Sequence, residues 1–283
     1  MSERTSFKGW TIPGPRPDPA VAAELSPREG ESLDALSGHF KIFQLKKGHR
    51  FSTDDVLAAW YGTSWCPTAR RALDLGSGIG SVGMIAAWRL PGAHFVTVEA
   101  QEISVELARR SARYNGLTDR YDIRLGDLRD PAVLAGEEPF DLVLGSPPYW
   151  PLSDGTPGNH PQKVACRFEM RGDIADYVAT ASEQLAPGGV FACVFPVHPE
   201  EQHHRVRDAA AAHDMTILRF RTVFLREGRP QSQIGLFLMV RDQDLPEWMR
   251  GEPFEEPPLI IRHADGSLSR EYSAVKISFG FPP

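Results

Sequence analysis

From about residue 70 onward, short apolar runs alternate with longer segments of helical periodicity. Strands are predicted from the apolar runs at 71–75, 94–99, 121–125, 140–145 and 190–196. Helices are predicted where apolar residues recur every three or four positions, at 81–90, 102–116, 173–189 and 199–213. Strands that alternate with helices are typical of a parallel sheet covered by helices on both faces.

The last two apolar runs of this pattern, 215–225 and 234–240, are joined only by the short segment REGRPQSQ. This connection is too short for a crossover helix, so it predicts an antiparallel hairpin at the edge of the sheet. We therefore expect an α/β fold with a doubly wound, seven-stranded, mostly parallel sheet and an antiparallel final hairpin.

The N-terminal part lacks this periodicity, and five prolines fall within residues 11–32. We predict a flexible N-terminal arm over 1–39. A single domain is predicted over 40–283, which includes a helical segment before the sheet (40–69) and a C-terminal tail (242–283).

The amino-acid composition indicates which classes of protein this chain can belong to. Of the 283 residues, 41% are hydrophobic and 24% charged, as in ordinary globular domains. No apolar run is long enough to cross a membrane, and the N-terminus lacks the apolar core of a signal peptide. Three scattered cysteines, Cys66, Cys166 and Cys193, argue against disulfides and zinc. We expect a cytoplasmic protein, as a monomer or weak homodimer.

Charge argues mildly against a dedicated nucleic-acid-binding domain, because the net charge is −6. Any such contact needs a local basic patch. Two clusters offer one, KKGHR at 46–50 and the arginines of the final hairpin, and each is also compatible with a solvated surface. The hairpin arginines are Arg219, Arg221, Arg226 and Arg229. The histidines between 198 and 213 differ in helical phase, and no carboxylate pair converges with them, so no metal site is expected.

A glycine-rich motif, LDLGSGIGSVG at 73–83, lies between the first predicted strand and its helix. Its residues Asp74, Gly76, Gly78 and Gly80 permit a tight turn and a close approach of backbone to a ligand. Glu99 ends the next strand, where nucleotide-binding folds place an acid for ribose hydroxyls. The spacing is G-x-G-x-G, which differs from the dinucleotide pattern G-x-G-x-x-G.

The third strand is followed by GDL at 126–128. In this order and spacing, the three features resemble the motifs of class I S-adenosylmethionine-dependent methyltransferases. The resemblance implies S-adenosylmethionine as cofactor, S-adenosylhomocysteine as product, and Asp127 with Leu128 near the adenine. The plain alternative is a glycine-rich turn with surface carboxylates.

The fourth strand ends in a rigid polar corner, Ser146-Pro147-Pro148-Tyr149-Trp150. SPPY resembles the (Asn/Asp/Ser)-Pro-Pro-(Tyr/Phe/Trp) motif of amino-methyltransferases, which modify exocyclic amines of adenine or cytosine or, in one branch, a glutamine amide. Such amines are poor nucleophiles, and the Ser146 hydroxyl and Pro147 carbonyl can accept their N–H groups. Prolines hold that carbonyl rigidly, and Tyr149 can stack on a base for about 1–3 kcal/mol. Trp150 can widen this stacking surface or simply pack.

Flanking segments carry a narrower resemblance, over roughly 40–275, to the bacterial tRNA adenine-N(6)-methyltransferase family that modifies the adenosine next to the anticodon of a valine tRNA. The segments are FKIFQLKKGHRFSTDDVLAAW (40–60), CRFEM (166–170) and PPLIIRHADGSLSREYSAV (257–275). The resemblance implies that Thr53 and Asp54 lie near the cofactor, that Ser146 touches both cofactor and target, and that Arg167 contacts substrate. A helix-capping role for Asp54 or Thr53 is the alternative.

Two departures from that family leave the target open. Ser146 replaces its usual asparagine, so the cytosine 4-amino group, a protein glutamine and a small metabolite remain alternatives to adenine. The arm (1–39) and the loop PLSDGTPGNHP (151–161) have no clear counterpart, and this loop is a candidate lid or recognition loop. The expected partner is RNA, most simply tRNA, with neither membrane nor metal.

Overall fold

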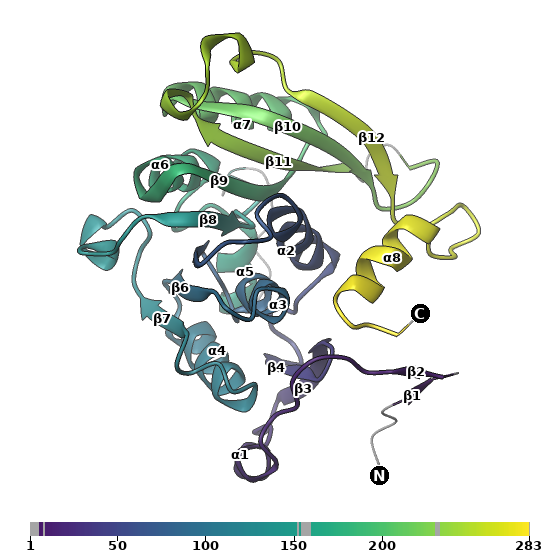
Figure 1. Cartoon of the computed structure of the whole chain (residues 1–283). Coiled ribbons are helices and arrows are strands. Elements are labelled where there is room, and N and C mark those ends of the chain that lie inside the picture. Colours follow the sequence, from purple (N-terminus) through teal and green to yellow (C-terminus); the bar gives the residue numbers. More distant parts are fainter. Residues whose placement is uncertain (1–5, 8, 152, 154–159, 230–232, 283) are drawn as a thin grey trace.

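The computed structural model describes residues 6–7, 9–151, 153, 160–229 and 233–282. A twisted central sheet is built from the strands β5 (Arg71–Leu75), β6 (His94–Glu99), β7 (Tyr121–Leu125), β8 (Phe140–Gly145), β9 (Leu185–Pro196), β10 (Met215–Phe224), β11 (Gln233–Arg241) and β12 (Phe254–Ile260). Their order across the sheet is β12-β10-β11-β9-β8-β5-β6-β7. Only β11 runs antiparallel to both of its neighbours, β9 and β10. The doubly wound, mostly parallel sheet with an antiparallel final hairpin is confirmed (Figure 1).

Helices cover both faces of this sheet. They are α2 (Thr53–Trp65), α3 (Ser81–Arg89), α4 (Glu102–Tyr114), α6 (Ile174–Gln184) and α7 (Glu200–Ala212). The first three pack with one hydrophobic cluster, and α6 and α7 pack with the other. Neighbouring residues of a buried strand contribute to opposite clusters, as Leu142 and Val143 do, because side chains alternate along a strand. A sheet buried on both faces explains the nearly continuous apolar runs.

An eighth strand differs from the expected seven. β12 pairs in parallel with β10 and forms the edge, so the final hairpin is not at the edge. Its sequence FEEPPLI contains two prolines, which hide the alternation but are tolerated on an edge strand. The predicted helix over 173–189 also ends early, at Gln184. Leu185 pairs with Phe140, so Leu185–Gly189 belong to the start of β9.

A hairpin of β3 (Glu31–Ser37) and β4 (Phe40–Leu45) packs beside α4. It spans the predicted boundary at residue 39, and β4 occupies part of the segment expected to be helical before the sheet. The division into arm and domain stays a prediction. The remaining elements are β1 (Ser6–Phe7), β2 (Trp10–Thr11), α1 (Pro19–Glu24), α5 (Pro161–Arg167), α8 (Arg270–Ser278) and the 3₁₀ turns η1 (Pro131–Leu134), η3 (Asp242–Asp244) and η4 (Glu247–Met249).

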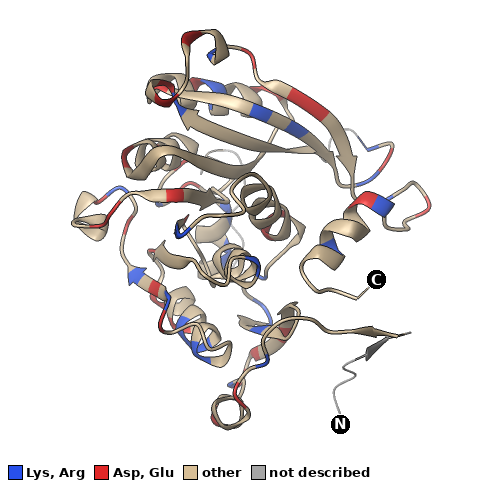
Figure 2. Ribbon diagram, in the orientation of Figure 1, with Lys and Arg blue, Asp and Glu red and all other residues tan. Residues whose placement is uncertain are grey.

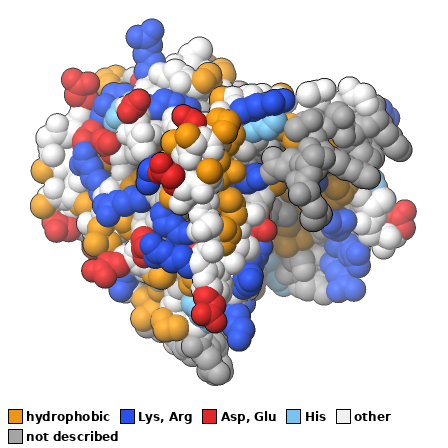
Figure 3. All heavy atoms as spheres, turned by 90° about the horizontal axis from the view of Figure 1, so that it is seen from below, with side chains coloured by type: hydrophobic (Ala, Val, Ile, Leu, Met, Phe, Trp, Pro, Cys, Tyr) orange, Lys and Arg blue, Asp and Glu red, His pale blue; other side chains and the backbone are white. Residues whose placement is uncertain are grey.

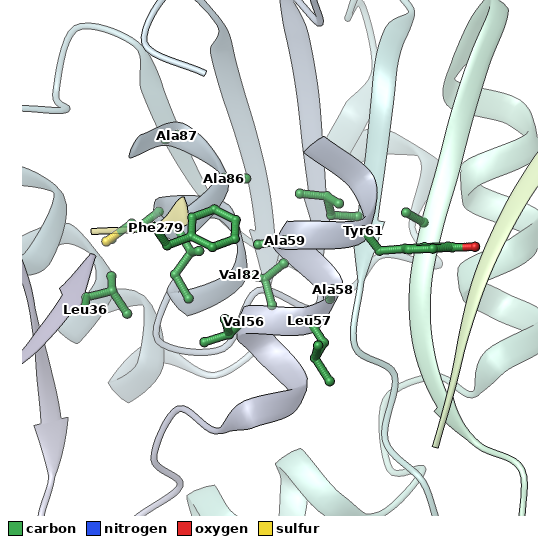
Figure 4. Packing of buried hydrophobic residues seen from close by; sticks show 14 of the residues in the cluster. Leu36, Val56, Leu57, Ala58, Ala59, Tyr61, Val82, Ala86, Ala87 and Phe279 are labelled. Carbon is green, nitrogen blue, oxygen red and sulfur yellow. The ribbon is translucent and has the colours of Figure 1, made fainter. Parts of the chain in front are cut away.

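Both ends of the chain contribute to one cluster. Figure 4 shows Leu36 of β3 and Phe279, just after α8, beside side chains of α2 and α3. The Gly38 N–H donates to the Phe279 carbonyl (3.0 Å). A Cβ on Gly280 would lie 2.8 Å from the Gly38 Cα, so this close approach requires glycine. Within the described residues, no helix is long and apolar enough to cross a membrane.

Candidate functional site

A cavity of about 1170 Å³ opens at the carboxyl edge of the parallel strands. The segments that line it include the glycine loop after β5, the end of β6, the loop after β7, the corner after β8, the loop before α2, and α5. Open α/β sheets bind ligands at this edge, where the strand order reverses. β5 and β8 meet at that switch point, so the glycine loop and the SPPYW corner face one space.

The glycine loop brings bare backbone to the cavity. Gly76, Gly78 and Gly80 have φ angles of 59°, 55° and 85°, a left-handed conformation that favours glycine. A Cβ on Gly76 would lie 1.7 Å from the Tyr177 hydroxyl oxygen, so another residue would clash there. Gly76 and Gly78 line the cavity, whereas Gly80 is the N-cap of α3 and positions the loop from behind.

Buried carboxylates form the floor. Asp74 Oδ2 accepts a hydrogen bond from the Gly83 N–H (2.8 Å), and Asp74 Oδ1 is buried without a partner among the described residues, as is Ser77 Oγ. Burial raises the pKa of Asp74 to about 8 and that of Asp55 to about 7. Unpartnered buried oxygens are costly, and a cationic or hydroxyl-bearing ligand would relieve them.

Glu99 ties the end of β6 to the glycine loop. Its Oε2 accepts from the Gly78 N–H (2.9 Å) and its Oε1 accepts from the Gln101 N–H (2.7 Å). Burial raises the pKa of this carboxyl. Glu99 therefore lies where the sequence predicts an acid for the ribose, and it also stiffens the loop.

The acid expected near an adenine ring lies differently. Asp127 accepts from Arg129 Nε (2.9 Å) and Nη2 (2.6 Å), and these bonds lower its pKa. Gly126 and Leu128 line the cavity, and Asp127 is not among its lining residues. For Asp127 to bind a ligand, its carboxylate would have to share its hydrogen bonds with Arg129 or exchange them for bonds to the ligand.

The corner after β8 is held by a neighbouring segment. The N–H groups of Tyr149 and Trp150 both donate to the Arg167 carbonyl at 3.2 Å, and the Glu169 N–H donates to the Trp150 carbonyl at 3.0 Å. Ser146, Pro147, Pro148, Tyr149, Trp150 and Arg167 all line the cavity. Backbone hydrogen bonds therefore hold the corner against the segment that contains Arg167 and Glu169.

The side chain of Tyr149 is fixed at both its ends. Its hydroxyl donates to Asp54 Oδ2 (2.6 Å) and also bonds the Ser146 hydroxyl. Its ring meets Phe195 edge-on, with centroids 5.9 Å apart. The Asp54 bond joins the start of α2 to the corner, a contact for which the sequence carries no signal.

Thr53 and Asp54 have separate surroundings. Asp54 lines the cavity, whereas the Thr53 hydroxyl bonds Tyr272 of α8, and Thr53 is not among the lining residues. The helix-capping alternative is wrong for both, because Ser52 is the N-cap and forms a capping box with Asp55.

Among the lining residues that the sequence did not predict are Asp55, Cys166 and Tyr177. Tyr177 lies on the buried face of α6, a position that reads as ordinary core. Asp55 has the sequence signal of a capping box with Ser52. No group of His, Cys, Asp and Glu side chains suited to a metal occurs in the described residues.

The two basic clusters differ in position. Lys47, His49 and Arg50 line the cavity. The hairpin arginines Arg219 and Arg221 instead pair with Glu256 and Glu271 at distances of 2.8 and 2.6 Å. Figure 2 shows the two basic positions of β10 beside the acidic stretch of β12.

Known proteins similar to this chain include a Porphyromonas gingivalis protein named tRNA1(Val) (adenine(37)-N6)-methyltransferase. It is 29% identical over 243 residues, which cover 82% of this chain and 89% of the relative. The release factor glutamine methyltransferase of Aliivibrio fischeri is 31% identical over 130 residues, 44% of either chain. The crystal structure of a predicted O-methyltransferase from Agrobacterium tumefaciens shares the fold, with a TM-score of 0.58, 20% identity, and coverage of 81% of this chain and 98% of that one.

A family model extends these likenesses across the sheet and its helices. The model called methyltransferase small domain matches residues 56–209, more than half of the chain. The matched segment contains the glycine loop, Glu99, the SPPYW corner and α5. The chain therefore belongs to the methyltransferase small domain family.

Proposed function

We propose that this protein transfers a methyl group from S-adenosylmethionine to the exocyclic N6 amine of an adenine in tRNA, near the anticodon. The observation that carries the proposal is the opening of the SPPYW corner into the same cavity as the glycine loop and its buried acids. The likeness over 82% of this chain to a relative named for adenine(37) supports the choice of base and RNA.

The residues present fit the cofactor. Within the part of the chain that the structure describes, Asp74 Oδ1 and Ser77 Oγ lack partners, and no atom lies within 4 Å of a Cβ position on Gly78, apart from its chain neighbours. Glu99 would hold the ribose, the loop at Gly76 and Gly78 would contact the amino-acid end, and Leu128 would contact the adenine. Asp54 would balance the cofactor's positive charge. When bound, the cofactor supplies an electrophilic methyl group on a sulfonium.

The corner supplies the rest of the mechanism. The Ser146 hydroxyl and Pro147 carbonyl accept the N–H groups of the target amine, which orients its nitrogen lone pair toward the methyl group. Tyr149 holds the base by its ring, while Asp54 fixes that ring through the hydroxyl. Catalysis then rests on position and on oriented dipoles, with no strong base.

The proposal can be tested by incubating purified protein with S-adenosylmethionine and unmodified valine tRNA transcript. Nucleoside mass spectrometry then identifies any methylated base. We expect N(6)-methyladenosine. 4-Methylcytidine would instead select the cytosine alternative that Ser146 leaves open. Transfer only to protein would select the glutamine alternative, for which the shorter likeness to the glutamine methyltransferase is the one specific observation. No transfer to RNA overturns the proposal.

Substitutions at the corner test the assigned roles. Removal of one preorganised polar group that supports a transition state typically costs about 100-fold in rate, so we expect that loss of turnover for Ser146→Ala. Tyr149→Ala should lose stacking of about 1–3 kcal/mol, and Tyr149→Phe should keep most of it. Calorimetric cofactor affinity should stay near wild type for both tyrosine variants. Unchanged turnover of Ser146→Ala would contradict its role.

A further inference from the structure

A group of basic side chains converges where the loop before α2 meets α5. Lys47 and His49 come from the loop, and Lys163 and Arg167 lie one helical turn apart on α5. All four line the cavity, with Lys47 and Arg167 exposed at its rim. Sequence positions 47 and 163 are far apart, so only the fold brings them together.

These cations lack compensating anions. Among the residues that the structure describes, Lys47, Lys163 and Arg167 form no ion pair with a carboxylate. Like charges four residues apart on a helix repel, so α5 carries an unfavourable pair. Burial together with the charges of Arg167 and Lys163 lowers the pKa of His49 to about 4. His49 is therefore neutral at physiological pH, and its surroundings are positive.

The scaffold that carries the cations is fixed at its base. Gln162 is buried, its Oε1 accepts from the His49 N–H (3.1 Å), and its Nε2 donates to Ser104 Oγ of α4 (3.1 Å). This side chain joins the loop, α5 and α4. The repulsive arrangement is thus held by neutral hydrogen bonds, independently of an anion.

The same segment is continuous with the substrate corner. The Arg167 carbonyl accepts from both Tyr149 and Trp150, so the base of its side chain is one hydrogen bond from the SPPYW corner. The acids Asp74 and Glu99 lie on the floor of the cavity, away from solvent. Cations at an exposed rim fit an anion that arrives from outside together with the target.

We propose that Lys47, Lys163 and Arg167 form a subsite for a backbone phosphate adjacent to the target nucleotide. This inference rests on the proposed function. A base brought into a pocket carries its flanking phosphates to the rim, and such contacts set register without reading sequence. The chain is acidic overall, and Figure 3 shows basic and acidic side chains mixed over the face seen from below. A local group of cations without a carboxylate partner among the described residues therefore has most to contribute.

The test compares how strongly the affinity for RNA depends on salt concentration in the wild type and in a variant without two of the cations. Affinity for unmodified valine tRNA transcript is measured against KCl concentration for wild type and Lys163→Gln/Arg167→Gln. One lost phosphate contact should reduce the slope of log K against log salt by roughly 0.7–0.9, and affinity near 0.1 M salt should fall about tenfold. Calorimetric affinity for S-adenosylmethionine should remain within about twofold.

Two further variants control the result. Arg70→Gln/Arg109→Gln removes the same charge from exposed positions away from the cavity, Arg70 preceding the amino end of β5, and should leave the slope unchanged. Lys163→Arg/Arg167→Lys retains charge and should retain the slope, which separates loss of charge from misfolding.

Two outcomes overturn the subsite. One is a slope equal to that of the distant control. The other is a loss of cofactor affinity with an unchanged RNA slope, which would assign the cations to the cofactor's carboxylate. Failure of the proposed function is a separate result, because wild-type protein would then neither bind nor methylate this RNA.

Discussion

Two groups of basic residues, one on β10 and one in the cavity wall, differ in their carboxylate partners. On β10, Arg219 pairs with Glu256 and lies over the Trp65 ring (3.9 Å to its centroid), and Arg221 pairs with Glu271. In the cavity wall, Lys163 and Arg167 lie one helical turn apart on α5, and neither pairs with a carboxylate in the described part of the chain. The sequence predicts a basic cluster from the hairpin arginines but none from Lys163 and Arg167, which the fold brings to the KKGHR segment at 46–50.

The two regions differ in whether the fold gives their polar groups a hydrogen-bond or ion-pair partner. β12 and α8 supply the acids that neutralise β10, so those arginines hold the C-terminal elements on the sheet. In the cavity, Asp74 Oδ1 and Ser77 Oγ have no hydrogen-bond partner among the described residues, and Lys163 and Arg167 have no ion pair among them. Unsatisfied groups destabilise a protein unless something binds there, so they indicate a ligand site.

The largest effect should come from removing a cavity carboxylate. Glu99→Gln replaces a charged hydrogen-bond acceptor with a neutral one. Hydrogen bonds to charged groups contribute about 1.5–3 kcal/mol each, so the affinity for S-adenosylmethionine should fall roughly 10–100-fold. Isothermal titration calorimetry measures it. Glu256→Gln on the other edge is the matched control and should bind cofactor normally. Equal affinities for both variants would remove the distinction between the two regions.

A smaller effect, on stability instead of binding, is expected at β10. Arg221 is largely buried and donates to the Pro257 carbonyl (2.9 Å) as well as to Glu271. Arg221→Met should lower the free energy of unfolding by about 1–3 kcal/mol. Urea titration measures this loss, and methyl transfer by the folded variant should persist. Lost transfer at unchanged stability would place Arg221 in the functional region.

A third effect should appear in how the stability of the cofactor-free protein depends on pH. Burial raises the pKa of Asp74 to about 8, so the folded state holds a proton that the unfolded state releases near pH 4. Stability from this group is therefore lost as pH rises between about 4 and 8. Relative to wild type, Asp74→Asn should gain at least about 1 kcal/mol from pH 5 to pH 8.

Thermal unfolding across that pH range provides the measurement. S-adenosylmethionine should reduce the wild-type loss, because its positive charge favours the ionised carboxylate. A constant difference between Asp74→Asn and wild type would show that Asp74 is ionised in the empty cavity.

Much of the fold was predictable because periodicity reports burial directly. The strands at 71–75, 94–99, 121–125 and 140–145 match their predicted bounds. β12 was missed because its prolines interrupt the pattern, and the start of β9 was missed because Pro-Gly-Gly reads as a helix end. The loop 151–161 lies largely outside the described residues, so its role as a lid or recognition loop stays a prediction.

The sequence by itself determined the chemistry of two turns. Glycines at 76, 78 and 80 permit left-handed backbone, the prolines of Ser146–Tyr149 make a rigid corner, and parallel strands bring both to one edge. The tertiary structure alone decided that Tyr149 bonds Asp54, and that Arg219 and Arg221 pair with carboxylates whereas Lys163 and Arg167 have no ion pair among the described residues. Local conformation depends on neighbours in the chain, whereas partnership of a side chain depends on which distant segment packs against it.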